Sequence, residues 1–188
     1  VALKAQDGLL NAGHVVAYEQ FAMRNDNELM SAMPDAAMTV TQDGNVLSIS
    51  GEQFHTALNL ETAQLTRYEA LGADGTFHAL IVPGEGTKGS FYRAATDNDR
   101  AFGSGLGHMN AAWKEPGAYV VTNRALYAGE NPIRVTFDGC YPALENMLVS
   151  LEYRFYGDGS IRVQMHLSAP EHQQLIYIPV VGMQMTGM

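Results

Sequence analysis

Two runs of alternating side chains, separated by a Gly-Asp-Gly sequence, constrain the fold of this chain more than any other feature. Residues 148–156 and 161–168 both alternate between apolar and polar side chains, which is the pattern of a strand with one buried face. Gly157, Asp158 and Gly159 lie between them and favour a tight turn. The region is therefore predicted to form an antiparallel β-hairpin.

Shorter runs of the same kind occur along most of the chain, with Gly, Asp and Pro between them. The strand candidates are residues 14–18, 38–41, 46–50, 58–60, 64–69, 118–122, 133–137 and 181–188. One short helix is predicted at residues 111–115. With 16 % charged residues and 19 glycines, the chain resembles a sandwich protein more than a helical bundle, whose exposed helices need many charges. The predicted fold is all-β, a large antiparallel β-sandwich.

The composition excludes several classes of function. Only 11 Lys and Arg residues stand against 20 Asp and Glu, for a net charge of −9, and a nucleic-acid-binding protein needs a basic face. No apolar run approaches the roughly 20 residues that span a bilayer. Cys140 is the single cysteine, so neither a disulfide framework nor a multi-cysteine zinc site is expected. The six histidines include no pair at helical i, i+4 spacing, so no metal site is predicted.

A polar, proline-containing stretch at residues 25–35 predicts a domain boundary. Residues 1–33 are too few for a domain and are expected to be the end of one, whereas residues 34–188 are expected to begin another. The chain starts with Val1 and its last residues alternate like the middle of a strand. Both ends are therefore expected to lie within a longer protein.

The most unusual stretch is residues 89–100, in which aromatic residues and an arginine precede a cluster of acids and an amide. Arg93 can form a bidentate ion pair with Asp97 or Asp99. One interpretation is a structural Arg–Asp network that holds a loop; the other is a loop that contacts a ligand or ion. The spacing of the acids does not match the calcium-loop pattern.

Residues 91–99, Phe-Tyr-Arg-Ala-Ala-Thr-Asp-Asn-Asp, resemble the Phe-Trp-Arg-Ala-Pro-Thr-Asp-Asn-Asp signature of the large bacterial β-galactosidases, glycoside hydrolase family 2. Ala95 stands where that family usually has proline. Further resemblances follow in the order of the family: residues 12–20 to the last strand of its immunoglobulin-like domain, residues 46–51 to the opening of its final domain, Trp113 and Gly117 to the region after the signature, and residues 153–159 to a later hairpin. Nearly the whole chain is covered.

The resemblance implies a large galactose-mutarotase-like supersandwich, preceded by the last strands of an immunoglobulin-like domain. The parent enzyme would hydrolyse terminal non-reducing β-D-galactosides with retention, in the bacterial cytoplasm, with a divalent cation such as Mg²⁺ and a monovalent cation. Its two catalytic glutamates lie in a (β/α)₈ barrel upstream of this region, and retention needs both. The chain itself is therefore expected to hold no catalytic residue and no cofactor, and to be inactive alone.

The expected partners are the upstream barrel and sandwich domains, the galactoside, and a second copy of the chain through exposed strand edges. Five weak candidates for substrate contact remain: Arg93, Asp97, Asp99, His108 and Trp113. His108 ends a glycine-rich segment, residues 103–108, that is either a surface connection or a loop facing sugar. Trp113 is either a core anchor or a platform for sugar stacking.

Two other functions stay open from the residues alone. An aldose epimerase or sugar-binding protein on the same fold would need an acid and a base on opposite sides of the ring, and His78 and His108 are available without a recommending spacing. An interaction module of a multidomain protein is the other alternative. Cys140 has no activating neighbour in the sequence and is expected to be inert. The methionines, including Met183, Met185 and Met188, are expected to fill gaps in the core.

Overall fold

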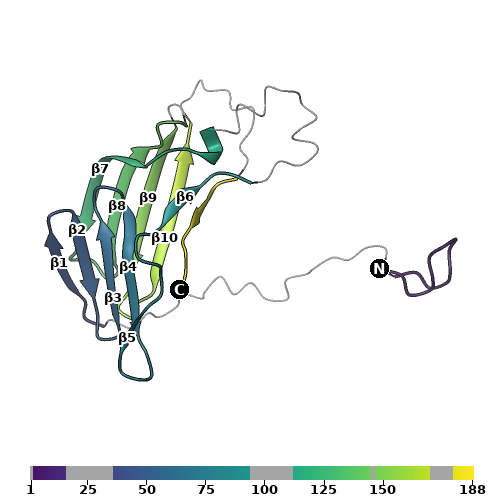
Figure 1. Ribbon diagram of the computed structural model, residues 1–188, viewed down its shortest axis with the longest axis horizontal. Coiled ribbons are helices and arrows are strands. Elements are labelled where there is room, and N and C mark those ends of the chain that lie inside the picture. The colour runs from purple at the N-terminus through teal and green to yellow at the C-terminus, as the bar shows by residue number, and fades with distance from the viewer. Residues whose placement is uncertain (1, 16–35, 94–111, 145–146, 170–179) are drawn as a thin grey trace. The chain divides into compact units, whose positions relative to one another are not determined.

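A computed structural model of the chain describes residues 2–15, 36–93, 112–144, 147–169 and 180–188 (Figure 1). The chain divides into two compact units, Val1–Ala32 and Met33–Met188. In the first unit an antiparallel bridge joins Ala2 and Val15. Most of the strand predicted at residues 14–18 lies outside the described residues, so its assignment to an immunoglobulin-like domain stays a prediction.

The second unit is nearly all β, and every strand pairing in its described residues is antiparallel. The first sheet has the order β1(Thr39–Asp43), β2(Val46–Ser50), β3(Phe54–Asn59), β4(Gln64–Leu71), β5(Phe77–Ala79). The second has the order β10(Ile161–Ser168), β9(Leu148–Phe155), β8(Ile133–Cys140), β7(Val120–Tyr127). A third, small sheet pairs β11(Gly182–Gln184) with β6(Lys88–Ser90).

The hairpin predicted from residues 148–168 is confirmed as β9 and β10, in which Tyr153 pairs with Val163. Its turn is closed by local hydrogen bonds. The Ser160 amide and hydroxyl both donate to Asp158 Oδ1, at 2.9 and 2.8 Å. Gly159 has a φ of +87°, a left-handed conformation that favours glycine. The prediction of a turn at Gly157-Asp158-Gly159 is therefore confirmed, and the aspartate and the glycine act in it as expected for a tight turn.

The remaining strand predictions also match observed elements, apart from their ends. The turn between β1 and β2 lies at Gly44, which has a φ of +54°. The predicted helix is a single turn at residues 112–114. The run at residues 118–122 begins later than predicted, because β7 starts at Val120 and extends to Tyr127. Of the run predicted at residues 181–188, only Gly182–Gln184 forms a strand, β11.

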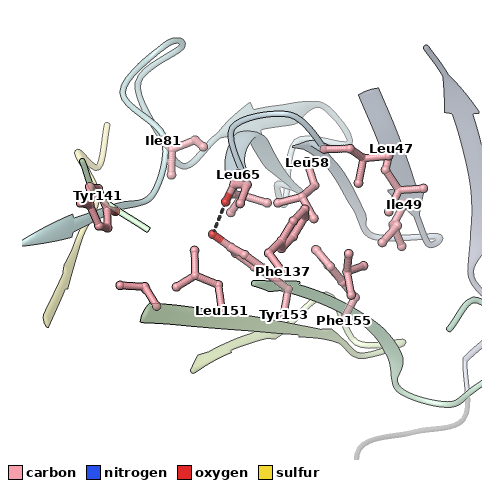
Figure 2. Close-up of a cluster of buried hydrophobic side chains, with 14 of the residues drawn as sticks. Leu47, Ile49, Leu58, Leu65, Ile81, Phe137, Tyr141, Leu151, Tyr153 and Phe155 are labelled. Atoms are coloured by element: carbon pink, nitrogen blue, oxygen red, sulfur yellow. Dashed lines mark hydrogen bonds between the residues drawn. The ribbon is translucent and has the colours of Figure 1, made fainter. Parts of the chain in front are cut away.

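The hydrophobic core lies between the two large sheets, which face each other (Figure 1). Figure 2 shows side chains of β2 and β3 on one side of this core and side chains of β8 and β9 on the other. The fully buried residues include Leu47, Ile49, Leu58, Phe137, Tyr153 and Phe155. In β8 and β9 every second residue is buried. The apolar residues of these alternating runs are therefore the ones that lie on the inner face of the sheet. The predicted all-β sandwich is confirmed.

One chain of hydrogen bonds crosses this core. The Leu65 amide donates to Thr87 Oγ1 at 3.0 Å, and the two hydroxyls of Thr87 and Tyr153 lie 2.7 Å apart. Tyr153 in turn donates to the Ala63 carbonyl at 2.7 Å, so Thr87 must be the donor to Tyr153. Each buried hydroxyl thus donates once and accepts once, which removes the cost of burying it.

The expected role of the C-terminal methionines is only partly right. Met183 packs against the core from β11. Met185 and Met188 are 48 % and 79 % exposed, so they do not fill core gaps. The reason is topological, because the tail pairs with β6 and with residues 80–82 and does not run between the two large sheets.

Candidate functional site

Four aromatic side chains gather where the chain enters and leaves residues 94–111. We call Phe91, Trp113, Tyr119 and Tyr141 the aromatic clamp. The ring centroid of Phe91 lies 6.1 Å from that of Trp113 and 5.0 Å from that of Tyr141, the latter in an edge-to-face arrangement. Tyr119 lies 5.3 Å from Tyr141. These are the distances at which aromatic pairs stabilise one another beyond their burial.

Hydrogen bonds fix the two tyrosines of the aromatic clamp in place. The Gly89 amide donates to the Tyr141 hydroxyl at 3.0 Å. The Tyr119 hydroxyl donates to the Val149 carbonyl at 2.7 Å. Burial raises the pKa of both tyrosines above the usual value for a phenol, so both hydroxyls remain protonated and neutral at physiological pH. The clamp thereby connects β6, β8 and β9 with the residues on either side of 94–111.

Position 89, beside the aromatic clamp, requires glycine because there is no room for a side chain. A Cβ there would lie 2.5 Å from the Tyr141 hydroxyl oxygen and 2.7 Å from an atom of the Phe91 ring. Both neighbours belong to buried aromatic side chains held by packing, so neither can move away at low cost. Any side chain at this position would therefore displace the clamp.

The sequence candidates divide between described and undescribed residues. Arg93 is half-buried and follows β6 and Phe91 directly. Asp97, Asp99 and His108 lie in residues 94–111, outside the described residues, and so does the whole glycine-rich segment, residues 103–108. The predicted ion pair between Arg93 and Asp97 or Asp99 therefore stays a prediction. What the structure does show is that Phe91 and Trp113, which bracket this segment, are held together in the core.

Trp113 is 7 % exposed and belongs to the core cluster. Its ring lies against Phe91, which leaves little of its face for a sugar. This placement favours the core-anchor interpretation over the stacking platform. The exposed aromatic ring nearby is Tyr92, 39 % exposed, with the Lys114 ammonium 5.8 Å from its centroid.

A cleft of about 470 Å³ opens beside the aromatic clamp. Its walls come from the β3–β4 turn, from β6, from residues 114–119 and from β11. Thr62 in that turn has a buried hydroxyl with no hydrogen-bond partner among the described residues. Ala63, which follows, has a φ of 55°, a left-handed conformation that is rare for a residue with a Cβ. Nothing in the sequence pattern marks Thr62, Tyr119 or Tyr141, so sequence reasoning missed this cleft.

Several carboxylates of the described residues are engaged in ion pairs. Glu130 accepts two hydrogen bonds from Arg134, at 3.1 and 3.2 Å, and Glu69 accepts one from Arg67 at 2.6 Å. These bonds lower the pKa of both carboxyls below the usual range. A general acid of a glycosidase needs the opposite shift, a raised pKa. Neither group is suited to that role.

The outer face of the second sheet carries the densest of these networks. Arg134 lies with its guanidinium carbon 3.7 Å from the centroid of the Tyr127 ring and also approaches Glu152 at 3.8 Å. Glu152 accepts a hydrogen bond from Arg154 at 2.7 Å. Because Arg134 and Arg154 are direct cross-strand neighbours, the carboxylate between them offsets their repulsion. The pattern explains a polar face of a sheet and needs no ligand.

Metal and membrane roles find no support in the described part of the chain. No group of three or more His, Cys, Asp or Glu side chains is placed to hold a metal ion there. No helix among those residues is long and apolar enough to cross a membrane.

Fold and site together define the class of this protein: an antiparallel β-sandwich module in which an aromatic clamp holds together the residues on either side of 94–111. Residues 50–187 match the family described as beta galactosidase small chain. The chain belongs to this family. A comparison with curated proteins finds no match.

Proposed function

We propose that this chain is a non-catalytic part of a β-galactosidase that hydrolyses terminal, non-reducing β-D-galactosides with retention. The observation that carries the proposal is the family match, which runs from the end of β2 to the bridge at Gly187. It takes in the second and third sheets and strands β3, β4 and β5 of the first. The catalytic glutamates would be supplied by a (β/α)₈ barrel, with which this sandwich associates.

In this association, the aromatic clamp would hold the two ends of a segment that carries candidate substrate-contacting residues. Residues 94–111 hold Asp97, Asp99 and His108, three of the five candidates for substrate contact. Their attachment points, Phe91 and Trp113, are buried in the core of the sandwich. A rigid scaffold beneath a functional segment is how many enzymes position binding residues. We infer that the sandwich presents residues 94–111 to the rim of the barrel's active site.

The first test is an activity assay on the chain by itself and with its partner. The chain alone should not release nitrophenol from a chromogenic β-galactoside, because it lacks the carboxylate pair. Addition or co-expression of the chain that holds the catalytic barrel should give full activity. Hydrolysis by the chain alone, retained after purification to homogeneity, would disprove the non-catalytic role.

The second test separates the rim role from simple scaffolding. In the assembled enzyme, Asp97→Ala should lower kcat/KM by at least about ten-fold, the effect of removing one charged contact of about 1.4 kcal/mol. Asp74→Ala is the matched control, because Asp74 is an exposed aspartate whose partners are Thr76 and His78 on its own hairpin. If both variants retain the parent kinetics, residues 94–111 do not line the active site.

A further inference from the structure

The second sheet ends in a strand whose outer edge is open. β10 is the last strand of this sheet (Figure 1) and pairs with β9 through all eight of its residues. In the part of the chain that the structure describes, no residue pairs with its other side. An open edge presents a row of backbone N–H and C=O groups to which a further strand can pair.

A hydrogen bond in the adjoining turn shows which backbone groups of β10 face the open side. The Tyr156 amide donates to the Ser160 carbonyl at 3.0 Å, so these two residues form a hydrogen-bonded pair. Such pairs alternate along antiparallel strands, so Arg162 and every second residue after it direct their backbone groups toward β9. The residues between them direct their N–H and C=O groups to the open side: Ile161, Val163, Met165 and Leu167.

The other edges of the two large sheets are protected, whereas that of β10 is not. β5 has only three residues, and in β1 only Val40 of five residues is not exposed. β7 contains an irregularity in its pairing, and its Arg124 donates to the Leu60 carbonyl of the opposite sheet at 2.8 Å. β10 has an unbroken register, no proline and no charged residue on its inner face. It lacks every device by which edge strands usually avoid pairing.

The inner face beside this edge is apolar and incompletely covered. The inward-facing residues of β10 are only partly buried, whereas those of β9 are buried. A groove of about 270 Å³ lies beside them, and its apolar walls come from β4, from β10 and from the tail of the chain: Leu65, Tyr68, Ile161, Val163, Met183 and Met185. A strand paired with β10 would place every second side chain over this groove, so apolar side chains at these positions would be favoured.

The outer face of β10 carries a positive charge without a counterion. Arg162 is exposed and lies directly opposite Arg154 of β9, and like charges in this position repel each other. Glu152 accepts its hydrogen bond from Arg154 at 2.7 Å. Among the described residues, Arg162 forms no ion pair. A carboxylate on a strand added at the open edge would lie opposite Arg162 and would offset this repulsion.

A second copy of the chain would not supply this carboxylate. When two copies of β10 pair antiparallel along most of their length with matching faces, the two-fold axis passes through Gln164 or Met165. Arg162 then lies opposite His166 or Ser168 of the second copy. Neither side chain offsets the charge of a guanidinium, so charge complementarity favours an acidic strand over self-pairing.

We propose that the open edge of β10 binds an extended strand of another polypeptide chain. Alternate side chains of that strand are apolar and cover the groove, and a carboxylate on its other face lies opposite Arg162. Main-chain hydrogen bonds to alternate residues of β10 hold it, as in other cases of strand addition. The inference does not rest on the function proposed above, because strand addition needs neither a catalytic barrel nor a reaction.

Binding can be measured on the chain with synthetic peptides. The probe is a labelled peptide of about eight residues, a typical strand length, in which valine alternates with glutamate. The control peptide has lysine in place of each glutamate. Fluorescence anisotropy should show saturable binding of the acidic peptide and a Kd about three- to ten-fold higher for the basic one. Equal binding of the two peptides, or no saturable binding of the acidic peptide below about 1 mM, would overturn the proposal.

Amide hydrogen exchange locates the bound peptide on β10. In the free monomer the amides of Val163, Met165 and Leu167 should exchange fast, and the acidic peptide should slow all three while leaving Gln164 and His166 unchanged. Slow exchange of the first three in the free monomer would show that another part of the chain covers the edge. Protection that rises with chain concentration and without peptide would show that a second copy binds there. Either result would overturn the proposal.

Two variants test the charge and the backbone separately. Arg162→Glu should reverse the preference, so that the basic peptide binds more tightly than the acidic one. Arg67→Glu is the matched control, since Arg67 is an exposed arginine of the first sheet, and it should keep the parent preference. Met165→Pro removes an amide that faces the open side, which edge strands tolerate, and should weaken binding at least about ten-fold with little change in Tm. A folded Met165→Pro variant that binds like the parent, or an unchanged preference in Arg162→Glu, would contradict docking at this edge.

Discussion

Tyr153 is the residue on which the connection between the two layers depends. Its hydroxyl accepts from Thr87 and donates to the Ala63 carbonyl, both within 2.7 Å, while its ring is fully buried in the second sheet. Phenylalanine at this position would keep the packing and leave two buried groups without partners.

Tyr153→Phe is therefore expected to lower the free energy of unfolding by about 1–3 kcal/mol, the cost of leaving buried polar groups unsatisfied. Chemical denaturation followed by circular dichroism measures the change. Tyr156→Phe serves as the control, because the Tyr156 hydroxyl makes no hydrogen bond among the described residues and its loss should change stability by less than about 0.5 kcal/mol. Equal effects of the two changes would contradict the role given to Tyr153.

The same tyrosine predicts how stability depends on pH. Burial raises the pKa of Tyr153 from 10.0 to about 12 in the folded protein. A raised folded pKa contributes stability that is fully present below pH 10 and is lost as the pH rises toward 12, by up to about 1.4 kcal/mol per pH unit. Denaturation between pH 8 and pH 11.5 should show this decline, and Tyr153→Phe should make it shallower. A parent protein with constant stability across that range would refute the prediction.

For single residues, the sequence predicts which face of a strand a side chain occupies, but it does not predict the partner of that side chain. The alternation of β9 places Tyr153 on the inner face, but no local pattern reveals that its hydroxyl meets Thr87, because the two are 66 residues apart. Trp113 was open between core and sugar platform for the same reason. Its burial depends on Phe91, which the chain brings close only after folding.

Gly139 shows how a single element depends on the absence of a side chain. It lies in β8 opposite Val121, next to an irregularity in the pairing with β7. A Cβ at this position would collide with the Val120 carbonyl oxygen and would lie 2.8 Å from the Tyr119 ring. The glycine thus allows β7 and the aromatic clamp to approach β8 closely.

Gly139→Ala is expected to destabilise the protein by about 1–3 kcal/mol, as overpacking does in tight cores. Thermal unfolding of the variant measures the loss. Gly129→Ala is the control, since a Cβ there would meet nothing within 4 Å and should leave Tm nearly unchanged. If Gly139→Ala unfolds at the parent temperature, the close approach of the two strands is not required.

Whole elements were easier to predict than their partners. The hairpins of β1 with β2 and of β9 with β10 follow from period-two runs and local turn residues, both readable within about twenty positions. The pairing of β6 with β11 was not predictable, because β6 has only three residues, Lys88–Ser90, and its partner lies about ninety positions later. Short strands whose partners are distant in the sequence carry too little local pattern to be recognised.

For the molecule as a whole, the single tryptophan offers a direct probe. Trp113 is the only tryptophan of the chain and belongs to the one core cluster that joins both large sheets. Its fluorescence emission should be blue-shifted in the native protein and should move to the red on unfolding. The transition should coincide with the loss of the far-ultraviolet circular dichroism signal, because both report the same core. Separate transitions would show that the end of the sandwich with the aromatic clamp unfolds independently.

The fold class could be predicted from the sequence because low charge, glycine-rich turns and alternation all point to one answer. The cleft beside the aromatic clamp could not be predicted from the sequence. The resemblance directed attention to residues 91–99, whereas the described cleft is made by Thr62, Tyr119, Tyr141 and residues near the C-terminal end of the chain. No short motif contains these residues, since only the packing of the sheets brings them together.

The hydrogen-bond chain through Tyr153 also determines how the layers are aligned. Apolar side chains attract one another without strong directional preference. Two sheets that meet through apolar faces can therefore shift by a fraction of a residue spacing with little change in buried area. A donor and an acceptor on opposite layers permit only one such alignment, because any slip leaves them unpaired. The hydroxyl of Tyr153 thus fixes the alignment of one sheet relative to the other. Without it, the protein should stay compact but should populate more than one alignment of the two sheets.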